Sequence, residues 1–109
     1  MTKINGSDAM LKVIYDWGID HIYGFPGGSF DSSMNAIYDF RDKMKFIEVR
    51  HEEAGALAAS SEYKVTGKLG VCFGSAGPGA AHLFNGLYDA KFDKTPMLAI
   101  VANVPTRKQ

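Results

Sequence analysis

Apolar residues along this chain follow two spacings, one typical of amphipathic helices and the other of buried strands. Helical spacing occupies four stretches, at residues 7–17, 30–38, 54–65 and 80–88. Four short apolar runs predict strands at residues 21–25, 46–49, 69–73 and 97–101. Strands that alternate with helices form parallel sheets through right-handed crossovers. The pattern therefore predicts an α/β fold, with an open, mostly parallel sheet, a βα repeat and helices on both faces.

The same spacing predicts which side of each helix is buried. Ser7 fits the N-cap of the first helix, and Gly18 and Gly67 fit the ends of the first and third helices. The expected apolar stripe of the first helix is Ala9, Met10, Val13, Ile14 and Trp17, and that of the third is Ala54, Leu57, Ala58, Ser61 and Val65. The stretch 80–88 is expected to form one helix. Small residues such as Ala59 and Gly86 should let neighbouring helices approach closely.

Three loops after predicted strands carry the candidate chemistry. Glycine-rich turns follow the first and third strands, at residues 24–29 and 74–79, and Glu52 follows the second strand. If the strand order is 2-1-3-4, as in flavodoxin-like sheets, the order reverses between strands one and three. Ligands of open parallel sheets bind at that reversal, beyond the carboxyl ends of the strands. We therefore expect both turns and Glu52 to line one crevice.

Composition and charge narrow the class of protein. A length of 109 residues and an apolar content of 46% suit one small globular domain. Twelve basic and twelve acidic residues balance, and the basic ones are scattered, so nothing favours nucleic acid or an anionic membrane as a partner. The longest apolar run, Met97 to Ala102, is too short for a membrane span, and the N-terminus lacks a signal-peptide core, which favours the cytoplasm. Cys72, in an apolar run, is expected to be a buried inert thiol.

Standard phosphate motifs do not fit the glycine turns. The spacing from Gly74 to Gly79 matches the start of a P-loop, but Ala80-Ala81 stands where Lys-Ser/Thr is required. Neither turn spells the dinucleotide motif G-x-G-x-x-G. The glycines instead allow a flat ligand to approach the main chain closely.

Two other readings compete for the loop after the second strand. His51-Glu52 begins like a zincin helix, but Gly55 replaces the second histidine of H-E-x-x-H, so no metal site is predicted. A carboxylate at a helix start can also serve only to complement the helix dipole, and Glu53 fits that role. Glu52, and His82 one turn beyond the second glycine turn, remain as candidate functional side chains.

Five motifs occur along the chain in an order known from one superfamily. They are Tyr23-Gly-Phe-Pro-Gly-Gly, Arg50-His51-Glu52-Glu53, Thr66-Gly-Lys-Leu-Gly-Val, Gly74-Ser-Ala-Gly-Pro-Gly and His82-Leu-Phe-Asn-Gly-Leu-Tyr-Asp-Ala. Together they resemble the N-terminal pyrimidine-binding domain of thiamine-diphosphate enzymes over nearly the whole chain. Within that superfamily they look most like the pyruvate oxidases, with the acetolactate synthases next. The chain ends soon after an apolar strand that needs cover on both faces, so residues 1–109 are expected to be the N-terminal part of such a domain, apparently truncated.

The resemblance implies roles for particular residues. Glu52 would be the catalytic carboxyl that hydrogen-bonds the pyrimidine ring of the cofactor and so promotes proton removal from the thiazolium carbon. A partly desolvated carboxyl would suit this role, so the pKa of Glu52 is expected to be raised. The other positions that match cofactor or substrate contacts of the family are Pro26, Gly28, Ser29, Pro78 and His82. Synthases commonly have asparagine at the position of His82, so the histidine favours the oxidase.

The resemblance also implies partners outside this chain. The Gly-Asp-Gly…Asn motif, which holds magnesium and diphosphate in the family, does not occur in the sequence. It lies in a C-terminal domain, and FAD of the oxidases is bound by a middle domain. Pyruvate and phosphate would be the substrates, and the cofactor would lie at a subunit interface of a homo-oligomer, a dimer or tetramer. The alternatives are an acetolactate synthase-like enzyme that condenses keto acids, and a non-catalytic interaction module.

Overall fold

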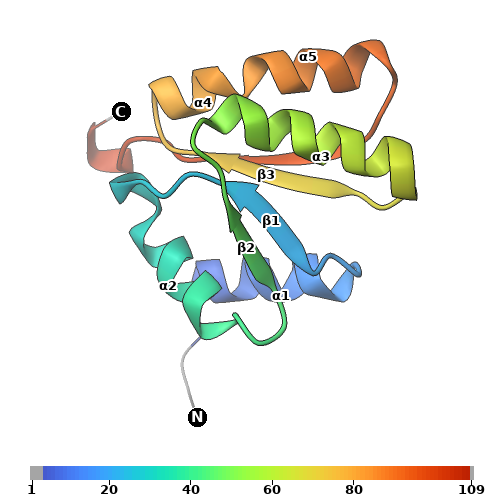
Figure 1. Ribbon diagram of the computed structural model, residues 1–109. Helices are drawn as coiled ribbons and strands as arrows, with labels where there is room; N and C mark the ends of the chain where they lie inside the picture. Colours follow the sequence, from blue (N-terminus) through green and yellow to red (C-terminus); the bar gives the residue numbers. More distant parts are fainter. Residues whose placement is uncertain (1–3, 109) are drawn as a thin grey trace.

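A computed structural model describes residues 4–108, in which helices and strands alternate as the sequence predicts (Figure 1). The elements are α1 (Gly6–Asp16), β1 (His21–Gly24), the 3₁₀ helix η1 (Gly28–Phe30), α2 (Asp31–Asp39), β2 (Lys45–Glu48), α3 (Glu52–Thr66), β3 (Gly70–Gly74), α4 (Pro78–His82), α5 (Phe84–Phe92), β4 (Met97–Val101) and the 3₁₀ helix η2 (Thr106–Lys108). None of the helices in this part of the chain is both long and apolar enough to cross a membrane.

The four strands form one sheet in the order β2-β1-β3-β4, and every neighbouring pair is parallel. This confirms the expected open α/β sheet and its flavodoxin-like order. All five residues of β3 are buried, because the strand is central and covered on both faces. The reversal of strand order falls between β1 and β3, where ligand sites of such sheets form.

Helices cover both faces of the sheet. α1 and α2 lie on one side, and α3, α4 and α5 lie on the other (Figure 1). The core beneath α1 and α2 is built from large side chains such as Leu11, Ile14 and Phe73. The core beneath α3 and α5 is small, with Ala56, Ala59, Cys72 and Leu83 as its buried residues. The burial predicted for Cys72 is confirmed, and burial raises the pKa of its thiol to about 12.

The small residues bring α3 close to its neighbours. A Cβ added at Gly86 of α5 would overlap Ala56 of α3, and one added at Gly70 of β3 would overlap the backbone of Ala59. These approaches confirm the prediction that small side chains let the helices pack closely. Gly67 ends α3 in the left-handed conformation, with φ of 75°, as its place after the helix predicts.

Two local predictions were wrong. The N-cap of α1 is Asn5, whose side chain accepts a bond of 2.9 Å from the amide of Asp8, while the Asp8 carboxylate accepts from the Asn5 amide. Ser7 instead lies within 3.2 Å of two serines of α2, because the chain enters the helix earlier than the apolar spacing indicates. The stretch 80–88 does not form one helix, since α4 ends at His82 and α5 begins at Phe84.

The predicted apolar stripes were also displaced. In α3 the buried face consists of Glu52, Gly55, Ala56, Ala59 and Ser60, whereas Val65 of the expected stripe is 84% exposed. The phase of the helix is set by its close contact with β3 and α5, which admits only small groups. In α1 the buried residues are Leu11 and Ile14, while Val13 and Trp17 are exposed.

Candidate functional site

The two glycine-rich turns lie against each other at the carboxyl ends of β1 and β3. The hydroxyls of Ser29 and Ser75 are 2.5 Å apart, and the amide of Ala76 donates to Ser29 Oγ over 3.1 Å. A Cβ at Gly27 would lie 2.7 Å from Ser75 Oγ, so a side chain there would force Ser75 to shift. The turns after strands one and three are therefore neighbours, as predicted.

Glu52 is the first residue of α3 and reaches the same edge of the sheet. The residue is only 8% exposed, although it carries a charge. Gly79, in the second turn, packs against it, because a Cβ at Gly79 would lie 3.1 Å from Glu52 Oε1. The N-cap of α3 is His51, whose Nδ1 accepts from the amide of Glu53 over 3.2 Å. The helix start thus holds the Glu52 carboxylate between α3 and the second turn.

His82 is the side chain that pairs with Glu52. Its Nδ1 lies 2.8 Å from Glu52 Oε2, and its side chain is 42% exposed. Because the carboxylate can only accept, Nδ1 carries the proton of this bond. The ring of His82 also stacks on that of His51, with centroids 4.2 Å apart and an angle of 29° between the planes. The stacked imidazole rings of His51 and His82 therefore lie beside the buried carboxylate of Glu52.

The pKa of Glu52 is lowered, which corrects the expectation that it is raised. Burial by itself raises the pKa of this carboxyl, and burial is the only one of these effects that the sequence predicts. The hydrogen bond from His82, a backbone hydrogen bond and the nearby charges of His82 and His51 act in the opposite direction and outweigh it. The hydrogen-bonding side chain among these partners, His82, comes from α4, and no local sequence pattern reveals that contact.

Glu53 occupies a different environment from its neighbour. Its Oε1 accepts a hydrogen bond of 3.1 Å from the side-chain amide of Asn85, on α5, and the residue is only partly buried. The structure therefore separates the two adjacent glutamates: Glu52 lies against the second glycine turn and His82, and Glu53 contacts α5.

The remaining predicted residues lie on the two turns. Pro26 and Gly28 are exposed in the first turn, and the polar contacts across the turns pass through Ser29. Pro78 is exposed at the start of α4, which places His82 at the other end of this short helix. The sequence reasoning missed Ser75 as a contact between the turns and His51 as the stacking partner of His82.

Three side chains of the site are of types that bind metals. Ligand atoms of His51, Glu52 and His82 all lie within 4.8 Å of one another, the one such group among residues 4–108. Two of the three offer nitrogen, which suits zinc better than magnesium. The Nδ1 atoms of both histidines are already engaged in hydrogen bonds, so the arrangement fits a hydrogen-bonded cluster better than a metal centre.

Comparison with known proteins assigns the family. Residues 4–109 match the family described as thiamine pyrophosphate enzyme, N-terminal TPP binding domain. The pyruvate oxidase of Lactiplantibacillus plantarum is 54% identical over 105 residues, covering 96% of this chain and 17% of that protein. The putative thiamine pyrophosphate-containing protein YdaP of Bacillus subtilis is 50% identical over 95% of the chain and 18% of its own length. The acetolactate synthase large subunit of Parasynechococcus marenigrum is 40% identical over 94% of the chain and 17% of its own length.

The chain thus spans about a sixth of the length of these relatives, 17 to 18% in each case. The match runs through both glycine turns, α3 and α4, the elements that form the site described above. The chain belongs to the thiamine pyrophosphate enzymes, and it corresponds to their N-terminal TPP binding domain.

Proposed function

We propose that this chain is the N-terminal part of the pyrimidine-binding domain of a thiamine-diphosphate-dependent pyruvate oxidase, and that Glu52 activates the cofactor. The reaction converts pyruvate, phosphate and oxygen into acetyl phosphate, carbon dioxide and hydrogen peroxide. The observation that carries the proposal is the buried Glu52 carboxylate, held at the carboxyl edge of a parallel sheet beside two glycine turns. Its family and the 54% identity to a pyruvate oxidase support the reaction class.

The residues present fit the pyrimidine end of the cofactor. Gly79 packs against the Glu52 carboxylate without a side chain, since a Cβ there would lie 3.1 Å from Oε1, and this lack of a side chain supports close approach of a flat ring to Oε1. His82 holds the other oxygen, Oε2, which orients the carboxylate and keeps it ionised until a ligand nitrogen competes for a proton. Bound thiamine diphosphate supplies an electron sink for decarboxylation, and Glu52 would promote its activation by exchanging a proton with the pyrimidine ring.

Magnesium, the diphosphate group and FAD would be held by other domains of the full-length protein. Among the described residues, the one group of three candidate metal ligands contains two histidines, whereas magnesium prefers oxygen ligands. The active assembly would be a homo-oligomer, a dimer or tetramer, with the cofactor between subunits. An exposed aromatic row on α5 supports a subunit contact, since Phe84, Tyr88 and Phe92 are 65%, 54% and 77% exposed.

An acetolactate synthase-like reaction is the second candidate, favoured by the 40% identity to a synthase large subunit. The two activities share the Glu52 chemistry and differ in what accepts the two-carbon unit. His82 supports the oxidase, because the resemblance of the motifs to the family implies asparagine at this position in the acetolactate synthases. A non-catalytic role would not account for the burial of the Glu52 carboxylate at the edge of the sheet.

A product assay on the full-length protein tests the proposal. We expect a yellow protein that, with thiamine diphosphate, magnesium, FAD and phosphate, consumes oxygen and forms hydrogen peroxide and acetyl phosphate from pyruvate. Formation of acetolactate without oxygen uptake would replace the oxidase by the synthase. Absence of pyruvate turnover under both conditions would reject the enzymatic proposal altogether.

A further inference from the structure

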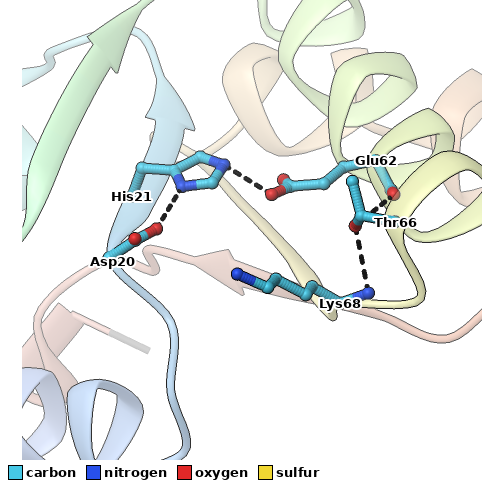
Figure 2. A network of polar contacts seen from close by, with 5 residues as sticks. All are labelled: Asp20, His21, Glu62, Thr66 and Lys68. Carbon is cyan, nitrogen blue, oxygen red and sulfur yellow. Dashed lines mark hydrogen bonds and ion pairs between the residues drawn. The ribbon is translucent and has the colours of Figure 1, made fainter.

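A second polar cluster lies at the opposite end of the sheet from Glu52. His21 is the first residue of β1, and its ring lies between the carboxylates of Asp20 and Glu62 (Figure 2). Nδ1 is 2.6 Å from Asp20 Oδ1, and Nε2 is 2.6 Å from Glu62 Oε1. Asp20 precedes the strand, whereas Glu62 comes from the last turns of α3. The ring therefore connects β1 to α3 through His21 and Glu62, which are 41 residues apart in sequence.

The two short contacts fix the protonation state of the ring. An ionised carboxylate has no hydrogen to donate, so each ring nitrogen must carry one. Only the imidazolium form has hydrogens on both nitrogens. A neutral ring would direct a lone pair at a carboxylate oxygen only 2.6 Å away, which is repulsive. With both carboxylates ionised, this geometry favours a positive charge on His21.

Other groups around the ring do not replace this charge. Tyr23, on the same strand, meets the ring edge-on with centroids 5.4 Å apart. The remaining charged groups lining the cavity around His21 are Arg41, Asp42, Lys43, Lys45 and Lys68. Of these groups, Lys68 acts on the cluster through its charge, which helps to lower the pKa of Asp20. Glu62 is 11% exposed, and its Oε2 is buried without a hydrogen-bond partner, so His21 is its ion-pairing partner.

The electrostatics of the ring agree with its geometry. Burial by itself lowers the pKa of His21, but the hydrogen bond to Asp20 and the charge and hydrogen bond of Glu62 more than compensate, and the pKa is raised. A raised pKa in the folded protein means that the contact stabilises fully below the ordinary histidine pKa of about 6.5. That stabilisation is lost as the pH rises through the folded-state pKa of His21.

The cluster is placed to hold the end of α3. Thr66 closes the helix one turn after Glu62, because its hydroxyl donates to the carbonyl of Glu62 and accepts from the amide of Lys68 (Figure 2). Val65, by contrast, is 84% exposed and packs little against the sheet. Two side chains of β1 reach Glu62 in this last part of α3. His21 bonds to it over 2.6 Å, and the pKa of Tyr23 is raised by burial and by the charge and hydrogen bond of Glu62.

We propose that Asp20, His21 and Glu62 form a pH-sensitive latch, which holds the C-terminal end of α3 on β1 while His21 is doubly protonated and releases it when the ring loses a proton to solvent. The released ring can keep one carboxylate bond but not both. This inference does not rest on the proposed enzymatic function, because it concerns the opposite end of the sheet.

Hydrogen-exchange mass spectrometry on the full-length protein tests the latch. Exchange of peptides covering residues 60–68 is followed from pH 5.5 to 9.5 and corrected for the intrinsic rate at each pH. Losing one charge-assisted hydrogen bond should raise the corrected rate about tenfold across the titration of His21. His21→Gln and Glu62→Gln should exchange at the fast rate throughout and show no step.

A matched control is Lys12→Gln, which removes the exposed ion pair of 2.8 Å between Lys12 and Asp16 on α1. This variant should keep the step in peptides 60–68. A wild-type protein without a step, or a step that persists in His21→Gln, would overturn the latch. If His21→Gln does not fold, Glu62→Gln decides the question in the same way, since it removes the same ion pair from the other side.

Discussion

Replacing Glu52 by glutamine tests the central assignment most directly, with Glu53→Gln as its matched control. The two residues are adjacent at the start of α3, and both carry a carboxylate. Glu52 is 8% exposed and bonded to His82, whereas Glu53 is partly exposed and bonded to Asn85. Glutamine keeps the size and shape of either side chain and removes only the charge and the exchangeable carboxyl proton. Because the chemical change is the same in both variants, any difference in turnover between them comes from where the carboxylate lies.

The structure sets the expected magnitudes. In Glu52→Gln the amide oxygen can still accept from His82 Nδ1, so a charge-assisted bond becomes a neutral one at a cost of roughly 1 kcal/mol. The fold should survive, since this is a small part of a domain's stability. Loss of a positioned proton-transfer group should lower pyruvate turnover by roughly 10² to 10⁴-fold. Glu53→Gln should change stability by less than about 0.5 kcal/mol and leave turnover within severalfold of wild type.

Steady-state turnover of pyruvate by the full-length protein, with cofactors saturating, measures the difference between the variants. Circular dichroism and the unfolding midpoint establish that both variants are folded. Equal losses of turnover in the two variants, or a Glu52→Gln enzyme as active as wild type, would show that burial at the crevice does not identify the catalytic carboxyl.

Three further outcomes follow from burial and packing. The pKa of Glu52 is lowered in the folded protein, so ionised Glu52 stabilises the fold at pH values above the ordinary glutamate pKa of about 4.3. This contribution is lost as the pH falls through the folded-state pKa. The difference in unfolding midpoint between wild type and His82→Gln should therefore be largest near neutral pH and vanish in acid. Gly86→Ala should lower the unfolding free energy by roughly 1 to 2 kcal/mol, because overlap of the new Cβ with α3 outweighs the better helix propensity of alanine. Gly6→Ala is the control and should not destabilise the protein, because a Cβ at Gly6 would meet no atom within 4 Å. Chemical denaturation of both variants measures the difference. Cys72 should resist a thiol reagent at pH 8 in the native protein and react once denaturant is added, since burial raises its pKa to about 12; rapid native labelling would contradict the buried assignment.

The sheet could be predicted from the sequence because its signals are local. Each strand is a short apolar run, and the turns after the first and third strands contain the glycines that a tight strand-to-helix connection needs. Given the order β2-β1-β3-β4, these turns must be neighbours, and the contact between Ser29 and Ser75 confirms that they are. Topology alone therefore predicts where the crevice forms.

The partners within the site could not be predicted in this way. The bond between His82 and Glu52 joins residues 30 positions apart, and it depends on α4 being a separate short helix that ends at His82. The apolar spacing predicts one continuous helix there, because it does not register the break at Leu83. For the same reason the pKa of Glu52 was expected to shift in the wrong direction: burial is visible in the sequence, but a hydrogen-bonding partner from another helix is not.

The burial of Glu52 follows from the rotational phase of α3, which close packing determines. Residues 52, 56 and 59 are spaced by four and three, so they lie on one side of the helix, and that side faces β3 and α5. Ala56 and Ala59 can occupy the contact because they are small, as the overlap expected at Gly86 shows. A stripe centred on Leu57 would instead have turned this side outward and left Glu52 in solvent. The alanines that fix the phase of α3 therefore also place its first carboxylate against the second glycine turn and His82, so enlarging either alanine should disturb the site as well as the core.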